Sequence, residues 1–572
     1  MGLQPPSTVG VASKDRRVSH QSSARISQET FDDAVRENMA ELDMEEAEAL
    51  ADAIAQFEAQ GIDLSNVLLQ PPTAERDAHP VLRGLTALLE ATRAGTDATR
   101  ELTFGEGSSQ STMRLKFKSL SGGAPLGAIV EDAADGGGGD AGRRTAGLAG
   151  ALDALAASCA VDGDEGKRNR ALLGSRDGID ALSSGTLSLI ERPELPSALD
   201  ALGAGLRAAE NRENIGIRGL LALYAVLAER PADAPVQAAA LRACAAAMVA
   251  HEANRAALHE KCRMVPSIVA ALRAHPAERA VVLAACAALR ALTLQDDGRV
   301  ALNKGFDRAR AAAEAGCLPL LAAQLAGAAS GEADLTLAGA LLNTLSRLTA
   351  SAKICETLVE LHAMDTAVQL LRARIADASI CRAACCFLAA LAGDDSAKAR
   401  LGEALVPQLA ATALAGHTDE AAALDACAQL VAALTTRHAA NCAAFADAAG
   451  GDALLGAMRR WPRHLPLHKR GALILRNLAV RVPEAVPGLL EQGAEPVLRA
   501  GMERSAELHD LAKAALRDMR CDVSLSQPWQ GMPGESHTLE MGEDAPDTFG
   551  AYMDTDEARE AMRFAGFDTS QM

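Results

Sequence analysis

The sequence predicts an all-α protein built as a right-handed solenoid of stacked helical repeats. The first observation is an apolar, Ala- and Cys-rich phrase that recurs along the chain, as in LRACAAAMVA (241–250) and RAACCFLAAL (382–391). Successive copies are 42, 56, 43, 42 and 45 residues apart, and a period near forty indicates helical repeats. The second observation is composition: hydrophobic residues form 49% of the chain and aromatic residues only 2%, which disfavours a strand-rich fold. The phrases are anchored at Cys244, Cys286, Leu342, Cys385, Cys427 and Ala472.

A set of glycines keeps the same period and provides the third observation. Gly451 in AAGGDALL and Gly493 in LEQGAEPVL are 42 residues apart, and Gly316 in AEAGCLPLL holds the equivalent place. Together with the phrases, these glycines favour three short helices per unit, which is typical of armadillo or HEAT-like repeats. One such unit cannot bury its apolar face alone, so we expect neighbours to stack and to form a concave groove.

The segment 25–69 precedes the repeats and places apolar residues among acidic ones at helical spacing. Ser27 and Thr30 offer capping oxygens where the first run starts, and Gly61 closes the second run. We therefore expect helices here, with an apolar face made by Phe31, Val35, Met39, Leu42, Leu50, Ile54 and Phe57.

This segment, followed by the repeats, resembles the armadillo repeat-containing protein 6 family. The resemblance covers residues 25–69 and about 165–531. It implies a non-enzymatic armadillo protein of the cytosol or nucleus, and it indicates the fold better than the function. Beyond the opening segment, the resemblance depends on the phrases HEANR (251–255), DDGRV (296–300), TLSRL (344–348), LILRNL (473–478) and AKAALRDMRCDVSL (512–525).

The chain is expected to divide into five regions that differ in charge. Residues 25–69 hold 12 acidic and 2 basic residues, a net charge of −10, and residues 532–572 hold 10 acidic and 2 basic residues, a net charge of −8. These two regions account for nearly all of the chain's net charge of −19. The body is therefore near neutral and the end regions are acidic. The regions are a disordered lead-in (1–24), an acidic helical segment (25–69), a helix with a flexible Gly/Ser-rich insertion (70–165), an armadillo-repeat solenoid (166–531) and an acidic flexible tail (532–572).

Charge and hydropathy also exclude some classes of partner. Nucleic-acid binding needs a clustered basic surface, which an acidic chain does not suggest. No apolar run reaches the length of about 18 residues that spans a bilayer, so we expect a soluble protein without a membrane partner. The N-terminus has no secretory apolar region. A cytoplasmic location, with the nucleus as an alternative, is expected. Partner proteins are expected, but the sequence names neither them nor an oligomeric state.

Motifs for chemistry are weak, so the sequence predicts no catalytic residue, metal or cofactor and no enzyme. HEANR has the His-Glu start of a zinc-protease helix, but Arg255 stands where the second histidine would be. Twelve cysteines are present, mostly inside the helical phrases, and we interpret them as small buried hydrophobic residues in a reducing compartment. Cys381 and Cys385 are one helical turn apart, which leaves metal binding or redox chemistry as the alternative.

The predicted function is that of a scaffold or adaptor that binds protein segments in its groove. The third helix of each unit lines the groove in armadillo arrays. Aligning the phrases places Arg347 and Asn477 at one outward position, and Arg290 and Arg476 at its neighbour. Asn can bridge a peptide backbone and Arg can bind a carboxylate. The candidate peptide-binding residues are Arg290, Asn343, Arg347, Leu473, Arg476 and Asn477.

Two other functions remain open at this stage. Nuclear-import carriers of this fold hold basic peptides with a ladder of Trp and Asn, but here Ala287, Cys386 and Leu473 occupy the Trp positions. A hydrolase would need a convergent set of polar residues that the sequence lacks.

The 56-residue step before Leu342 is longer than the others because it contains an insertion at 296–317. The insertion carries a basic cluster, which we interpret as a solvated helix face; a docking loop is the alternative. The cluster is Arg299, Lys304, Arg308 and Arg310.

Overall fold

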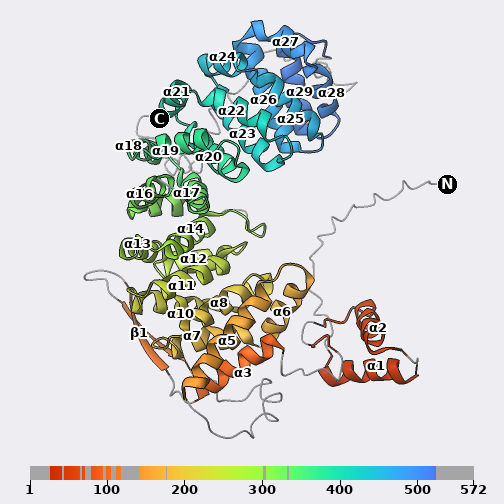
Figure 1. Cartoon of the computed structure of the whole chain (residues 1–572), viewed down its shortest axis with the longest axis vertical. Helices are drawn as coiled ribbons and strands as arrows, with labels where there is room; N and C mark the ends of the chain where they lie inside the picture. Colours follow the sequence, from red (N-terminus) through yellow and green to blue (C-terminus); the bar gives the residue numbers. More distant parts are fainter. Residues whose placement is uncertain are drawn as a thin grey trace, which may run out of the picture. The chain divides into compact units, whose positions relative to one another are not determined.

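The fold was analysed in a computed structural model of the chain (Figure 1). The described residues up to Cys521 belong to one compact unit, and Asp522 begins a second. The predicted lead-in (1–24) and tail (532–572) lie outside the described residues. The structure describes residues 26–41, 44–64, 67–70, 79–93, 98–104, 111–117, 141–175, 177–300, 304–330 and 334–523.

The acidic N-terminal segment folds as the helical pair α1 (Gln28–Glu41) and α2 (Glu46–Ala59). Ser27 caps the first helix as predicted, since its Oγ accepts a hydrogen bond from the backbone N of Thr30 at 3.1 Å. The pair has a hydrophobic core of its own, in which the rings of Phe31 and Phe57 lie 6.0 Å apart. The fully or nearly fully buried members of this core are Phe31, Val35, Ala49, Ala53, Leu64 and Val67.

A short hairpin lies within the segment predicted as a helix with a flexible insertion. Strand β1 (Ala98–Phe104) pairs antiparallel with β2 (Ser111–Phe117), so that Ala98 faces Phe117 and Phe104 faces Ser111. Sequence reasoning missed this hairpin because it gave weight to the glycines and serines of the region. The alternation of polar and apolar residues in ATRELTF and STMRLKF was the available signal.

The remainder of the described chain is a stack of helical units, which confirms the predicted all-α solenoid (Figure 1). In a complete unit the chain runs through a first, a second and a third helix, and the second and third helices pack on their counterparts in the next unit. The third helices form an unbroken ladder, each packing on the next: α5 (Ala141–Ala160), α8 (Leu195–Gly205), α11 (Ala234–Met248), α14 (Arg279–Thr293), α17 (Leu335–Leu348), α20 (Ala378–Leu391), α23 (Ala421–Thr435), α26 (Leu465–Arg481) and α29 (Ala506–Asp518).

The second helices make a parallel layer beside this ladder. The layer comprises α3 (Pro80–Arg93), α7 (Gly178–Ser188), α10 (Gly216–Glu229), α13 (Met264–Ala274), α16 (Cys317–Ala329), α19 (Ala363–Ala373), α22 (Val406–Gly416), α25 (Gly450–Arg460) and α28 (Ala494–Met502). The first helices are α6 (Asp164–Ser175), α9 (Ala209–Asn214), α12 (Glu252–Glu260), α15 (Gly305–Glu314), α18 (Ala352–Glu360), α21 (Asp395–Glu403), α24 (Ala439–Asp447) and α27 (Val486–Glu491), the last preceded by a 3₁₀ turn (Pro483–Ala485).

Small residues let the third helices approach closely. All six anchors of the recurring phrase, from Cys244 to Ala472, are fully buried in the ladder. Because α3 packs on α5 and α7, and α5 packs on α8, this packing reaches into the 70–165 segment.

From α7 onward, a residue with left-handed backbone conformation lies at the start of each second helix. Gly316 and Gly493 supply it with φ of 86° and 83°, directly before α16 and α28. At the third predicted landmark, Gly451 lies inside α25, and Ala449 adopts the left-handed conformation instead (φ 55°). The period of the glycines therefore marks the turn. In AAGGD, however, the left-handed residue is Ala449, two residues before the predicted Gly451.

An asparagine at the start of the first helix ties a unit to its predecessor at three places in the array. Asn254 at the start of α12 donates from Nδ2 to the carbonyl of Ala247, which ends the third helix before it, and to the carbonyl of Arg212, 42 residues earlier, both at 2.9 Å. One side chain thus satisfies two buried carbonyls and ties a unit to its predecessor. Asn211 makes the same pair of bonds to Gly205 and Arg170, and Asn441 to Leu434 and Lys398.

Candidate protein-binding face

Three neighbouring third helices, α14, α17 and α20, expose a continuous set of side chains that we call the ladder face. Its members lie in the middle and C-terminal turns of these helices, and the neighbouring helices pack directly on one another. The hydroxyl of Ser346 on α17 bonds to the carbonyl of Cys386 on α20 at 3.3 Å and links two of them. The accessible residues are Leu283, Ala287, Arg290, Ala340, Asn343, Ser346, Arg347, Arg382, Cys386 and Ala390.

The ladder face includes three of the predicted binding residues. Arg347 is exposed, and Arg290 and Asn343 are half-buried. Within the described part of the chain, neither arginine forms a side-chain hydrogen bond or an ion pair, so both guanidinium groups are available to a partner. This placement agrees with the expected outward position of these residues.

The three predicted residues on α26 have different roles. The Nε of Arg476 donates to the Asp518 carboxylate at 2.8 Å, so this guanidinium is occupied by an acidic residue of the next third helix. Asn477 is 8% exposed, and its Nδ2 donates to the hydroxyl of Thr435 at 3.2 Å. The prediction that Asn477 points outward is therefore wrong, because its amide bridges α23 and α26. Leu473 is half-buried on the same helix.

Sequence reasoning missed Arg382, which is the first residue of the phrase RAACCFLAAL. It is half-buried on α20 and forms no side-chain hydrogen bond or ion pair among the described residues. Burial raises the pKa of the nearby Cys386 thiol, and the charges of Arg382, Arg470 and Arg347 act in the opposite direction. The signal that could have identified Arg382 is its place within the phrase, three residues before the anchor Cys385.

On third helices beyond the ladder face, two arginines pair with aspartates of the preceding third helix. Toward the N-terminus, Arg242 donates three hydrogen bonds to Asp200, one from Nε at 3.0 Å and two from Nη2 at 2.7 and 2.9 Å. Toward the C-terminus, Arg470 binds Asp425. By contrast, the ladder face contains three arginines and no acidic side chain. The positive charge of these three arginines is thus not neutralised by an ion pair within the described residues.

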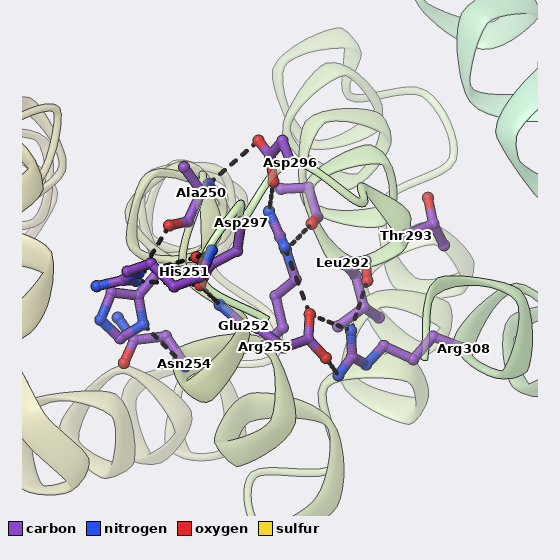
Figure 2. A network of polar contacts seen from close by, with 12 residues as sticks. Ala250, His251, Glu252, Asn254, Arg255, Leu292, Thr293, Asp296, Asp297 and Arg308 are labelled. Atoms are coloured by element: carbon purple, nitrogen blue, oxygen red, sulfur yellow. Dashed lines mark hydrogen bonds and ion pairs between the residues drawn. The ribbon is translucent and has the colours of Figure 1, made fainter. Parts of the chain in front are cut away.

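A second polar site, shown in Figure 2, lies where α12, α14 and α15 meet. Glu252 is at its centre and receives hydrogen bonds from two buried arginines. Arg308 donates to both carboxylate oxygens, at 3.1 Å for Nη1 to Oε2, and Arg255 donates to Oε2 at 3.4 Å. The Nε of Arg255 also donates to the carbonyl of Ala291 at 2.8 Å. Each charge is therefore buried together with a partner of opposite sign.

Two successive aspartates close this site over the start of α12. Asp296 accepts from Arg255 and, at 3.1 Å, from the backbone N of Ala250. Asp297 accepts from the backbone N of Glu252 at 2.8 Å. The phrases HEANR and DDGRV, which support the family resemblance, thus meet in one network (Figure 2). Together these residues join the start of α12 to the loop that follows α14, the third helix of the same unit.

The network holds Glu252 and Asp297 in the ionised form. Burial pushes the pKa of Glu252 upward, but hydrogen bonds and charges from Arg308 and Arg255 outweigh it and hold the pKa below its usual range. Hydrogen bonds from Arg299, with backbone N–H groups, lower the pKa of Asp297 despite its desolvation. Each carboxylate therefore stabilises the fold as an anion.

The basic cluster in the insertion is not a simple solvated helix face. Arg308 is 1% exposed, which overturns that interpretation for this residue, because the buried Glu252 draws it inward. Each of the four cations has an acidic partner, which leaves no free cluster for docking. Arg299 binds Asp297 and Glu213, Lys304 binds Glu260, Arg308 binds Glu252 and Arg310 binds Asp307.

Within the described residues, no single helix is long and apolar enough to span a bilayer. Only the pair α15 and α16 reaches such a length when joined, and an 81° bend separates its two helices.

The fold and the ladder face define an armadillo-type repeat protein. The expected resemblance to the armadillo repeat-containing protein 6 family is also confirmed. Residues 23–80 match the family model described as "Armadillo repeat-containing protein 6 N-terminal domain". The human armadillo repeat-containing protein 6 is 28% identical over 358 residues, which cover 61% of this chain and 60% of the relative. The Drosophila melanogaster homolog is 46% identical over 57 residues, 10% of this chain and 12% of the relative.

Solved structures with a similar backbone include an engineered protein and a chain from work on cadherin and β-catenin. The engineered protein is 18% identical, with a TM-score of 0.48, over 69% of this chain and 95% of its own. A chain from a study of the phosphorylation switch that controls the interaction between cadherin and β-catenin is 16% identical, with a TM-score of 0.46, over 69% of each chain.

Proposed function

We propose that the protein is a non-enzymatic scaffold that binds an extended, acidic protein segment on its ladder face. The observation that supports this most directly is the set of unpaired arginines on three consecutive third helices, Arg290, Arg347 and Arg382. An arginine binds a carboxylate through a fork of two hydrogen bonds, and these three have no acidic residue of the fold to bind. Arg476 is not part of the proposed site, because Asp518 occupies it.

The repeat geometry fits an extended chain. Packed helices lie about 8–10 Å apart, and an extended peptide advances about 3.3 Å per residue. One carboxylate at about every third position would therefore meet successive arginines along the ladder face. Asn343, between two of the arginines in the chain order, offers an amide that can bond to the peptide backbone.

A nuclear-transport carrier is the second candidate function. Such carriers hold basic peptides between Trp and Asn side chains. Here the corresponding accessible positions are Ala287, Cys386 and Leu473, and the face carries positive charge, which repels a basic cargo. We therefore favour the acidic segment. A cytoplasmic or nuclear location is part of this proposal.

The test replaces the three arginines by glutamate in the full-length chain. The matched control is Arg192→Glu/Arg218→Glu/Arg374→Glu, which alters the net charge equally at exposed residues outside the third helices. Proteins retained by each chain from a cell extract are quantified by mass spectrometry. Each lost contact costs about 1 kcal/mol, so three should weaken binding roughly a hundredfold. Thermal stability should change little, as for most surface substitutions.

The expected pattern is loss of the same partner proteins from the ladder-face variant and their retention by the control. Higher salt should reproduce the loss for the wild-type chain, since the contacts are ionic. Equal recovery by both variants would refute the proposal. Loss of a bound nucleic acid instead of a protein would also refute it.

A further inference from the structure

Three cysteines from two neighbouring third helices converge in the ladder. Cys381 and Cys385 lie one turn apart on α20, and Cys427 lies on α23. The Sγ of Cys427 is 3.6 Å from that of Cys381 and 3.7 Å from that of Cys385. All three thiols are fully buried, and their sulfur atoms all lie within 4.8 Å of one another. No other group of cysteine, histidine or carboxylate side chains in the described residues is placed to hold a metal ion in this way.

Packing alone does not account for a third sulfur. Cys385 and Cys427 occupy the anchor position of their units, where Cys244 and Cys286 stand in earlier units and Leu342 stands in the unit between them. Those earlier anchors lie on the adjacent helices α11 and α14 and are equally buried. The additional thiol is Cys381, one turn before the anchor. The equivalent places in α11 and α14 hold an alanine and a valine.

The distances fit a metal ion bound by thiolates. Zinc binds sulfur at about 2.3 Å with tetrahedral angles, which places two sulfur ligands about 3.8 Å apart. The two measured separations, 3.6 and 3.7 Å, are close to that value. A disulfide needs about 2.05 Å between its sulfurs and joins only two of them, so it would leave one buried thiol unused.

A histidine lies beside one of the three thiols. His417 is next to Cys381 and is 7% exposed, but its ring nitrogens do not belong to the set of ligand atoms that lie within 4.8 Å of one another. Its Nε2 lies 2.7 Å from the carbonyl of Ile375. A carbonyl only accepts, so Nε2 carries the proton and donates, and the lone pair of Nδ1 remains for another partner. Histidine ligands of zinc are commonly oriented by such a bond to a carbonyl. His275 makes the same bond to Pro231 in an earlier unit.

We propose that Cys381, Cys385 and Cys427 form a structural zinc site, and that the ring of His417, which lies beside Cys381, turns toward the ion to supply the fourth ligand when zinc binds. Binding of Zn²⁺ releases the protons of the three thiols, and a neutral imidazole leaves a net charge of −1 in the buried site. The ion would tie α20 to α23 and to His417, which follows α22. Because the site has no access to solvent, zinc must enter while the chain folds.

The test measures zinc in the full-length chain, produced in zinc-supplemented medium and purified without a chelator. About one zinc per chain is expected, as for a closed four-ligand site. Cys381→Ser and Cys427→Ser should each lower the zinc content at least tenfold. Cys286→Ser is the matched control, since it removes a buried anchor thiol of another unit, and it should leave the zinc content unchanged.

A second measurement does not depend on whether the variants fold. A mercurial reagent that caps thiols is added to the wild-type chain together with a zinc indicator. Release of the metal in step with capping supports the site. Zinc below about a tenth of an equivalent, copper in its place, or a disulfide between two of the three cysteines would overturn the proposal. Retention of zinc by the Cys381→Ser/Cys427→Ser double variant would overturn it as well.

Discussion

The buried carboxylate of Glu252 should matter far more to the fold than an exposed carboxylate on the same helix. The change Glu252→Gln keeps the shape of the side chain and removes its charge. Arg255 would retain Asp296 and the carbonyl of Ala291. Arg308, which is 1% exposed, would keep only a 3.4 Å bond to the carbonyl of Leu292 besides the new amide. The cost of the change therefore falls mainly on Arg308.

The size of the effect follows from burial. Removing one partner of a buried ion pair costs about 3–5 kcal/mol, whereas an exposed pair contributes about 0–1 kcal/mol. Glu260 provides the matched control, because it ends the same helix and its side chain, 51% exposed, pairs with Lys304 at 3.3 Å. Glu260→Gln makes the same chemical change at an exposed position.

Hydrogen exchange of the backbone amides in α12 and α15 is the appropriate assay, because a repeat array can open locally without unfolding as a whole. A loss of about 3 kcal/mol should accelerate exchange in these helices roughly a hundredfold. Glu260→Gln should accelerate it less than about tenfold. Equal acceleration by the two variants would refute the argument that burial of Glu252 with Arg308 stabilises this junction.

Two further predictions concern pH and the acidic tail. The folded-state pKa values of Glu252 and Asp297 are depressed, so their contribution is fully present above the unfolded values of about 4.3 and 3.9 and is lost as pH falls further. The urea concentration at the unfolding midpoint should be constant from about pH 7 to 5 and should decrease once the pH is below about 4. The decrease should be smaller in Asp297→Asn, and an equal decrease in the variant and the wild-type chain would contradict this. From its sequence, the segment 532–572 carries 10 acidic and 2 basic residues and could compete with partners for the ladder face. Its deletion should then tighten partner binding, more so at low salt, and unchanged affinity there would exclude competition.

The sequence by itself determined the class of fold. The period near 42 residues, with small residues at Cys286, Cys385 and Cys427, required helices that approach closely and repeat, and the structure places all three in one ladder. The pattern of residues 25–69 likewise predicted helices and a capping Ser27. Such features are readable because they depend on neighbours within one helix or on a fixed step along the chain.

The tertiary structure alone decided which polar side chains remain free. Arg347 and Asn477 align in sequence, yet one is exposed and the other bonds to Thr435 on a neighbouring helix. Arg308 appeared to belong to a solvated cluster, but it is buried and donates hydrogen bonds to Glu252, 56 residues earlier in the chain. The three thiols meet only because α20 packs on α23. Contacts of this kind depend on the partner that a helix meets across the array, and the periodicity of one helix contains no information about that partner.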